Sequence, residues 1–158
     1  MAVRVIRENN RSEGKIKAAA APEIIAGMPL VLASASEVKP YDDALALDIP
    51  FGVAAQSTAM LPFAPSDGNV VGEGYNYTDY ARGGLVSCFV NGCELELYDD
   101  GRGAPYVAAD TFVLNRPVYV NASGLITSVI GAPALPKVGI VIDVEGAPVT
   151  RLRIKFDL

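Results

Sequence analysis

The sequence contains no histidine, the side chain that most often serves as a general base or a metal ligand. It has only two cysteines, and neither has a histidine to act as its base, so a thiol nucleophile is poorly supported. No Walker A motif, glycine-rich dinucleotide turn or Gly-x-Ser-x-Gly elbow occurs. We therefore predict that the protein is not an enzyme and uses neither a metal nor a cofactor.

Long apolar runs are also missing. No stretch approaches the roughly 18 consecutive apolar residues of a membrane span, and the N-terminus is charged from Arg4 onward without the apolar core of a signal peptide. We therefore expect a protein that is made in a cytoplasm and has no contact with a membrane. In that reducing compartment, Cys88 and Cys93 are expected to be buried thiols.

Acidic residues gather at 99–103, where the sequence reads Asp-Asp-Gly-Arg-Gly. A calcium loop needs oxygen ligands at alternating positions, and this stretch lacks them. We interpret it as a solvated acidic turn.

What the sequence does contain is the pattern of an all-β protein, with 15 glycines, 11 prolines and 51% hydrophobic residues. Residues 117–120 form a β-rich run that enters the turn 121–124, and 125–130 leaves it, which predicts a hairpin. Apolar residues then alternate along 138–144 and along 152–158, and in the second run the intervening positions are charged. The 158 residues are enough for one domain with a core that needs no disulfide.

An internal repeat supports this interpretation. Residues 28–34 match 116–122 at an offset of 88, and 50–54 match 136–141 at an offset of 86 to 87. Short β segments can match by chance, but the turn and the glycine-containing strand entry recur in the same order. This order favours two similar lobes in one barrel or sandwich.

A second hairpin is predicted over 85–98, because Asn91-Gly92 is typical of a two-residue turn. Its register would place Cys88 and Cys93 diagonally across the ladder, about 7 Å or more apart, which is poor disulfide geometry. The pairs expected on one face are Val90 with Cys93, Cys88 with Leu95, and Val86 with Leu97.

Residues 1–26 are predicted to form an extended N-terminal arm that precedes a body at 27–158. Residues 1–25 hold five basic and three acidic side chains, whereas the rest of the chain holds eight basic and 15 acidic ones. The arm is too polar to fold alone, so we expect a partner surface to order it and the body to fold without it. Without interleaved aromatic residues, the arm is a poor binder of nucleic acid. The residues predicted to carry attachment are Val3, Arg4, Val5, Ile6, Arg7, Arg11, Lys15 and Lys17.

A long irregular insertion at about 56–84 interrupts the body and is rich in Gly, Pro, Asn and Tyr. Loops of this length are usually functional or part of an interface. Tyr75, Tyr77 and Tyr80 would suit a protein contact or a sugar platform, or they would simply cover the end of a barrel.

Four segments, together with the closing alternating strand, resemble the head decoration, or structural cement, proteins of tailed bacteriophages. These segments are 27–33, 50–54, 117–127 and 138–141, and the resemblance extends over about residues 27–158. It implies a small β-barrel, often of the β-tulip kind, that binds the outside of a capsid as a homotrimer and reinforces it, frequently through an N-terminal arm. The tyrosine-rich insertion is longer than the family pattern implies.

The sequence therefore predicts an all-β fold, a small β-barrel or β-tulip/sandwich with an extended N-terminal arm. The expected function is that of a virion protein on the outer capsid surface, with the major capsid protein and copies of itself as partners and no nucleic acid. The alternative is a short head fibre or a carbohydrate-binding module that uses the tyrosine-rich loop. Loss of glycan binding on replacement of Tyr75, Tyr77 and Tyr80 would favour this alternative over a capsid protein.

Overall fold

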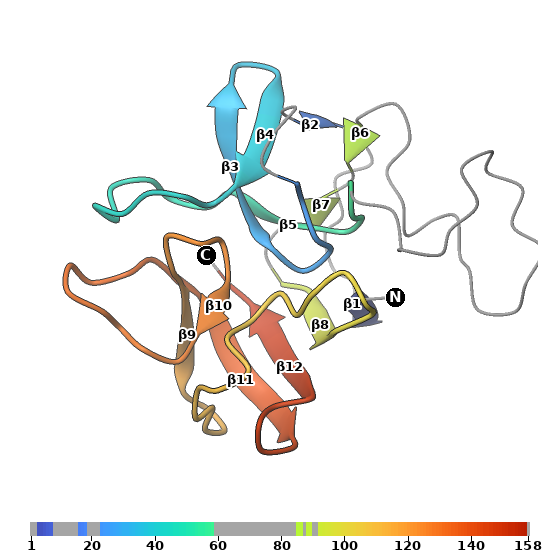
Figure 1. Ribbon diagram of the computed structural model, residues 1–158, viewed down its shortest axis with the longest axis vertical. Coiled ribbons are helices and arrows are strands. Elements are labelled where there is room, and N and C mark those ends of the chain that lie inside the picture. The colour runs from blue at the N-terminus through green and yellow to red at the C-terminus, as the bar shows by residue number, and fades with distance from the viewer. Residues whose placement is uncertain are drawn as a thin grey trace, which may run out of the picture.

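The computed structural model describes residues 3–7, 16–18, 23–58, 85–86, 88–89 and 92–157. These residues contain no helix and form twelve strands, so the predicted all-β class is confirmed (Figure 1). The strands are β1 (Val3–Arg7), β2 (Ile16–Ala18), β3 (Pro29–Ser34), β4 (Glu37–Pro40), β5 (Gly52–Ala54), β6 (Leu85–Val86), β7 (Cys88–Phe89), β8 (Glu94–Tyr98), β9 (Pro117–Val120), β10 (Ile126–Thr127), β11 (Lys137–Glu145) and β12 (Arg151–Phe156).

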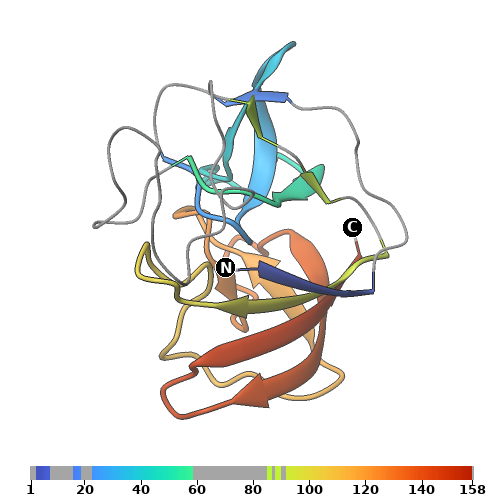
Figure 2. The ribbon, with the colours of Figure 1, turned by 90° about the vertical axis from the view of Figure 1, so that its right-hand side faces the viewer.

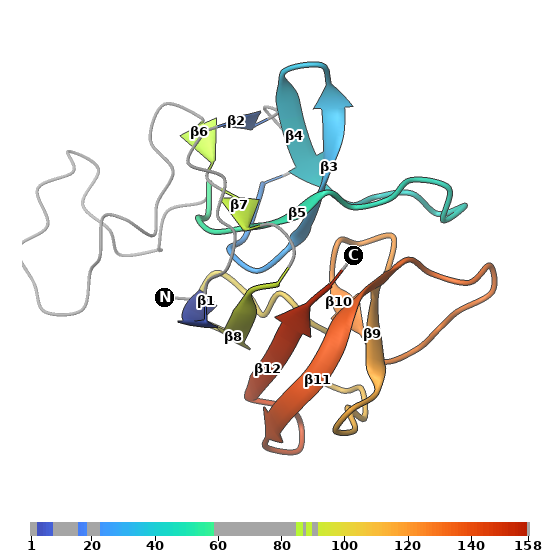
Figure 3. The same ribbon diagram turned by 180° about the vertical axis from the view of Figure 1, so that it is seen from behind.

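The strands build two six-stranded sheets that lie one above the other in Figure 1. Sheet A has the order β1-β8-β12-β11-β9-β10, most of which is seen from behind in Figure 3. Sheet B has the order β6-β2-β4-β3-β5-β7. Neighbouring strands are antiparallel except β2 and β4, which run parallel. Among the described strands neither sheet closes on itself, so of the two predicted architectures the structure agrees with a sandwich and not with a closed barrel.

The internal repeat is present in the strand register. In sheet B, β3 pairs with β4 on one side and β5 on the other, and in sheet A β9 pairs with β10 and β11 in the same way. The equivalent pairs are Leu32 with Val38 and Val120 with Ile126 in the hairpins, and Leu30 with Gly52 and Val118 with Gly139 on the other side. Each strand position differs from its equivalent by 87 or 88 residues, so the two lobes share one architecture.

The same repeat extends into the turn that precedes each central strand. Residues 25–28 and 113–116 each form a turn closed by a backbone hydrogen bond from the fourth residue to the first, of 3.0 and 3.1 Å. The third residue has positive φ in both turns, 96° at Gly27 and 61° at Asn115. Gly and Asn are the residues that most readily adopt this conformation. We call 24–58 the first repeat and 112–144 the second repeat.

The two sheets share a large core that is built from both repeats. Its sheet A contribution comes from the inner face of β8, β9, β11 and β12, and in β8, β9 and β12 the buried apolar residues alternate with less buried ones. Sheet B contributes Val31, Tyr41, Val53 and Phe89. A smaller cluster lies on the opposite face of sheet B and consists of Ile24, Leu30, Val38, Ala54, Val86 and Cys88. Sheet B therefore has buried apolar residues on both faces.

The predicted hairpin over 85–98 is wrong. Within this segment, β7 pairs with β5 in sheet B, whereas β8 belongs to sheet A. Both edges of β8 are already occupied, by β1 and by β12, so it has no edge left for β7. β7 and β8 therefore lie in different sheets, and Cys88 and Cys93 lie in different apolar clusters.

The residues predicted to form an arm contribute strands to the chain's own sheets. β1 lies along β8 at the end of sheet A, as its dark blue ribbon shows in Figure 2. β2 lies between β4 and β6 in sheet B. The division between an arm at 1–26 and a body that folds without it stays a prediction.

The charged face predicted for the last strand is present on β12. Arg153 pairs with Glu94 on β8 at 3.0 Å, and Arg151 pairs with Glu145 at 2.7 Å and with Glu96 at 3.6 Å. Because these side chains are partly exposed, each ion pair contributes modestly to stability. These ion pairs connect β8, β11 and β12 across the outer face of sheet A.

Candidate interaction surface

The loop at 42–49, between β4 and β5, projects from one side of the molecule (teal in Figure 1). It is organised by the carboxylate of Asp43, which accepts hydrogen bonds from three backbone amides. The N–H groups of Leu45, Leu47 and Asp48 donate to it over 2.8, 2.6 and 2.8 Å. These bonds allow a loop with little packing of its own to hold one shape.

The apolar side chains of this loop point into solvent. Leu45, Leu47 and Ile49 are 67%, 77% and 79% exposed. Single exposed apolar residues are ordinary on protein surfaces, but three within five residues of a projecting loop form a surface suited to contact with another molecule. We call residues 42–49 the apolar loop.

The carboxyl group of Asp43 has a pKa below its ordinary value. The amides of Asp48 and Leu45 are the main cause, because they donate hydrogen bonds to the ionised form, and Leu47 adds to the effect. The lowered pKa means that ionised Asp43 favours the observed loop. This contribution is present above the ordinary aspartate pKa and is lost as the pH falls through the lowered value.

We expect the apolar loop to report this titration directly. In a pH titration followed by NMR, the amide signals of Leu45, Leu47 and Asp48 should move with a midpoint below the ordinary pKa of an aspartate. Asp43→Asn should abolish the transition and increase hydrogen exchange at the same amides. A midpoint at or above the ordinary value would show that these amides do not hold the carboxylate.

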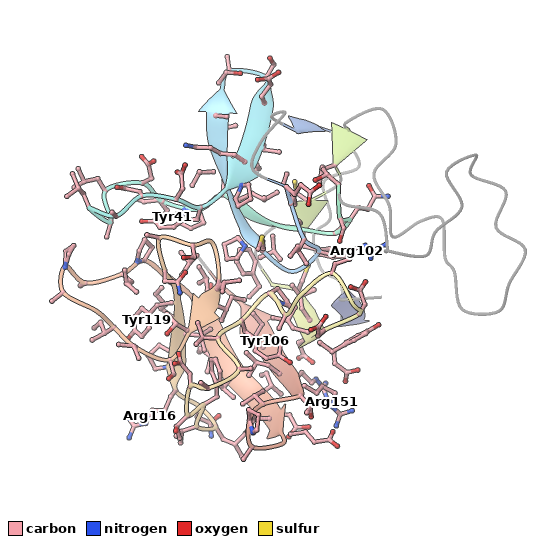
Figure 4. The ribbon with its side chains drawn as sticks, viewed as in Figure 1. Tyr41, Arg102, Tyr106, Arg116, Tyr119 and Arg151 are labelled. Carbon is pink, nitrogen blue, oxygen red and sulfur yellow. The ribbon has the colours of Figure 1, made fainter. Side chains whose placement is uncertain are left out.

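A second exposed apolar surface lies on the second repeat, beside β9. Val113, Leu114, Val129 and Ile130 are between 52% and 56% exposed. Next to them is a surface hollow of about 350 Å³, which we call the β9 hollow. Figure 4 labels two of its residues, Arg116 and Tyr119, on the flank of sheet A. The residues that line it are Thr111, Val113, Arg116, Pro117, Tyr119, Ser128, Ile130 and Val141.

Arg116 provides the charge at the β9 hollow. The residue is exposed, and its side chain makes no ion pair with any residue that the structure describes. An unpaired guanidinium within an apolar surface offers a directional contact for a carboxylate.

In the acidic turn at 99–103, the carboxylates of Asp99 and Asp100 bind partners within the turn itself. Asp99 accepts hydrogen bonds from the amides of Gly101 and Gly103 over 2.8 and 3.0 Å, and Asp100 pairs with Arg102.

Among the described residues, no group of three or more metal-ligating side chains gathers anywhere. Nor do these residues include a helix with the length and apolarity needed to cross a bilayer.

The two cysteines are buried and free, as the sequence predicts. Burial raises the pKa of the Cys88 thiol to about 11, so this group stays protonated and unreactive at neutral pH.

The site residues that the sequence predicts fall partly outside the described part of the chain. Val3, Arg4, Val5, Ile6 and Arg7 form β1, and Lys17 lies in β2, where the structure gives backbone positions. The others, Arg11, Lys15, Tyr75, Tyr77 and Tyr80, lie outside the described residues.

Reasoning from sequence places Tyr41, Asp42, Asp43 and Asp48 in a loop, but it does not identify the apolar loop as an exposed surface. Its signal is the alternation of Leu45, Leu47 and Ile49, which resembles that of a short strand with one buried face. Asp43 turns the segment into a loop instead, and the three side chains are all exposed.

No protein-family model matches this sequence, and no curated protein matches it.

Proposed function

We propose that the protein is a structural virion protein that binds the outer surface of a phage capsid and stabilises it. The proposal combines the resemblance of residues 27–158 to head decoration proteins with the surface of the folded chain. Its partners are the major capsid protein and further copies of the chain, arranged as a trimer on the shell after synthesis in the host cytoplasm.

The observation that carries the proposal is the apolar loop. Burying a leucine or isoleucine side chain at an interface contributes about 1.5 to 3 kcal/mol relative to leaving it in water. A fold that presents Leu45, Leu47 and Ile49 on an internally hydrogen-bonded loop is suited to assembly with another protein. A protein that reinforces a shell needs contacts of this kind, because several weak contacts made together give tight attachment.

Strand β1 supports an attachment role for the N-terminal residues. It is the terminal strand of sheet A, and its outer edge pairs with no described strand. An open strand edge can accept a strand from a neighbouring protein through backbone hydrogen bonds. In this proposal Arg4 and Arg7 add contacts to carboxylates on the shell.

The test is co-sedimentation of the purified chain with capsids. The wild-type chain should bind, and Arg4→Ala combined with Arg7→Ala should weaken binding in a salt-dependent way. Substitution is a cleaner test than truncation, because removal of residues 1–17 would also remove β1 and most of β2. The matched control is Lys137→Ala combined with Lys155→Ala, which removes the same charge away from β1 and from the apolar loop. Absence of binding by the wild-type chain would contradict the proposed function.

A further inference from the structure

The internal repeat allows the same face to be compared in the two lobes. In the first repeat, one face carries Ala26, Val31, Tyr41 and Val53, all buried in the core shared with sheet A, and Ala55 packs against them. The second repeat covers this face with the inner face of sheet A. The contact between the lobes therefore joins two different faces of the repeated unit.

The equivalent face of the second repeat is apolar but uncovered. The matching residues, in the same order and at offsets of 87 to 88, are Leu114, Tyr119, Val129, Ile140 and Ile142. Leu114, Val129 and Ile142 are exposed, and Tyr119 and Ile140 are only partly buried. A face that is core in one repeat thus remains apolar and open in the other. The β9 hollow lies against this face, since Tyr119 belongs to both.

The chain carries a surface that complements this face. The apolar loop presents Leu47 and Ile49 on either side of Asp48, whose carboxylate makes no ion pair with any described residue. The β9 hollow presents apolar walls around Arg116, which is likewise without an ion pair in the described part of the chain. One surface is therefore apolar with an available carboxylate, and the other is apolar with an available guanidinium.

We propose that the apolar loop of one copy docks into the β9 hollow of a second copy of this chain, with Asp48 of the first copy pairing with Arg116 of the second. The complementary surfaces occur on the same polypeptide, and the loop's side chains are too exposed for the loop to fill its own hollow. A contact between two different surfaces passes from copy to copy and closes into a ring when the rotation allows it. The inference rests on the proposed function only in taking the protein to be an assembly component, and it does not require a capsid.

The first measurement is sedimentation equilibrium of the full purified chain without capsids. The wild-type chain should self-associate reversibly, and Leu47→Ser or Val113→Ser should each weaken association by about tenfold or more. Both positions are exposed, so the variants should keep the wild-type circular dichroism spectrum. The matched control is Leu32→Ser, which changes an exposed leucine outside both surfaces and should leave association unchanged.

The second measurement tests the charge pair. Asp48→Arg and Arg116→Asp should each weaken association by about tenfold or more, because like charges then face each other, and the double variant should recover most of the loss. A wild-type chain that stays monomeric at its highest soluble concentration overturns the inference. So does an association that neither reversal changes.

The outcomes separate this inference from the proposed function. If the chain is monomeric and the Leu47 variant loses binding to capsids, the loop's partner is the shell protein, and only the inference fails. If the chain self-associates as described but does not bind capsids, the proposed function fails and the inference stands.

Discussion

Replacing Gly139 with alanine is expected to destabilise the protein by about 3 kcal/mol, the upper end of the usual cost of overpacking. Gly139 lies in β11 between β9 and β12, opposite Val118 and Phe156. A Cβ at this position would collide with the backbone carbonyl oxygen of Lys155. The obstacle is backbone in a paired strand, so a change of side-chain rotamer cannot relieve the collision.

The repeat provides the matched control. Gly52 occupies the equivalent position in the first repeat, and a Cβ there would lie 2.9 Å from the carbonyl oxygen of Phe89. Within the described part of the chain, β7 has two residues and pairs only with β5, so it can shift more easily than β12. Gly52→Ala should therefore cost less than Gly139→Ala. Urea unfolding followed by circular dichroism measures both, and an unchanged midpoint for Gly139→Ala would mean that β11 and β12 do not pair in this register.

The part of the fold that could be predicted from sequence is the part governed by local pattern. Residues 152–156 alternate between apolar and charged side chains, and a strand with one face in the core and one in water requires this alternation. The hairpin of β9 and β10 follows in the same way from the turn at 121–124, where the Asn121 side chain accepts hydrogen bonds from the amides of Ser123 and Leu125. The repeat was visible because it preserves the residues that fix strand register.

The predictions from sequence fail where the structure depends on which strands pair with each other. Asn91-Gly92 is a good turn sequence, but a turn does not show whether the flanking strands pair with each other. β8 pairs instead with β1 and β12, which are far away in sequence, and no local pattern identifies them. Sequence reasoning does not identify the exposed surface of the apolar loop for a related reason, since alternating apolar residues are buried only where a neighbouring strand supplies hydrogen bonds. Here the carboxylate of Asp43 accepts those bonds instead.

Replacing Phe156 with alanine should lower the free energy of unfolding by about 3 to 5 kcal/mol. Its side chain is fully buried in the core shared by the two sheets. Truncation to alanine would remove the whole ring from this core and leave a cavity, because β12 is held on both sides by β8 and β11.

Phe156 also takes part in the backbone hydrogen bonds that hold β12 in place. Its amide donates to the carbonyl of Cys93 over 2.8 Å, and its carbonyl accepts from the amide of Gly92 over 3.0 Å. The last strand is therefore fixed by its side chain and by its backbone, and it should not fray. Lys155→Ala, at the exposed neighbouring position, is the control and should change stability by no more than about 0.5 kcal/mol. If urea unfolding gave similar small losses for both variants, the C-terminal strand would contribute far less to the core than its burial implies.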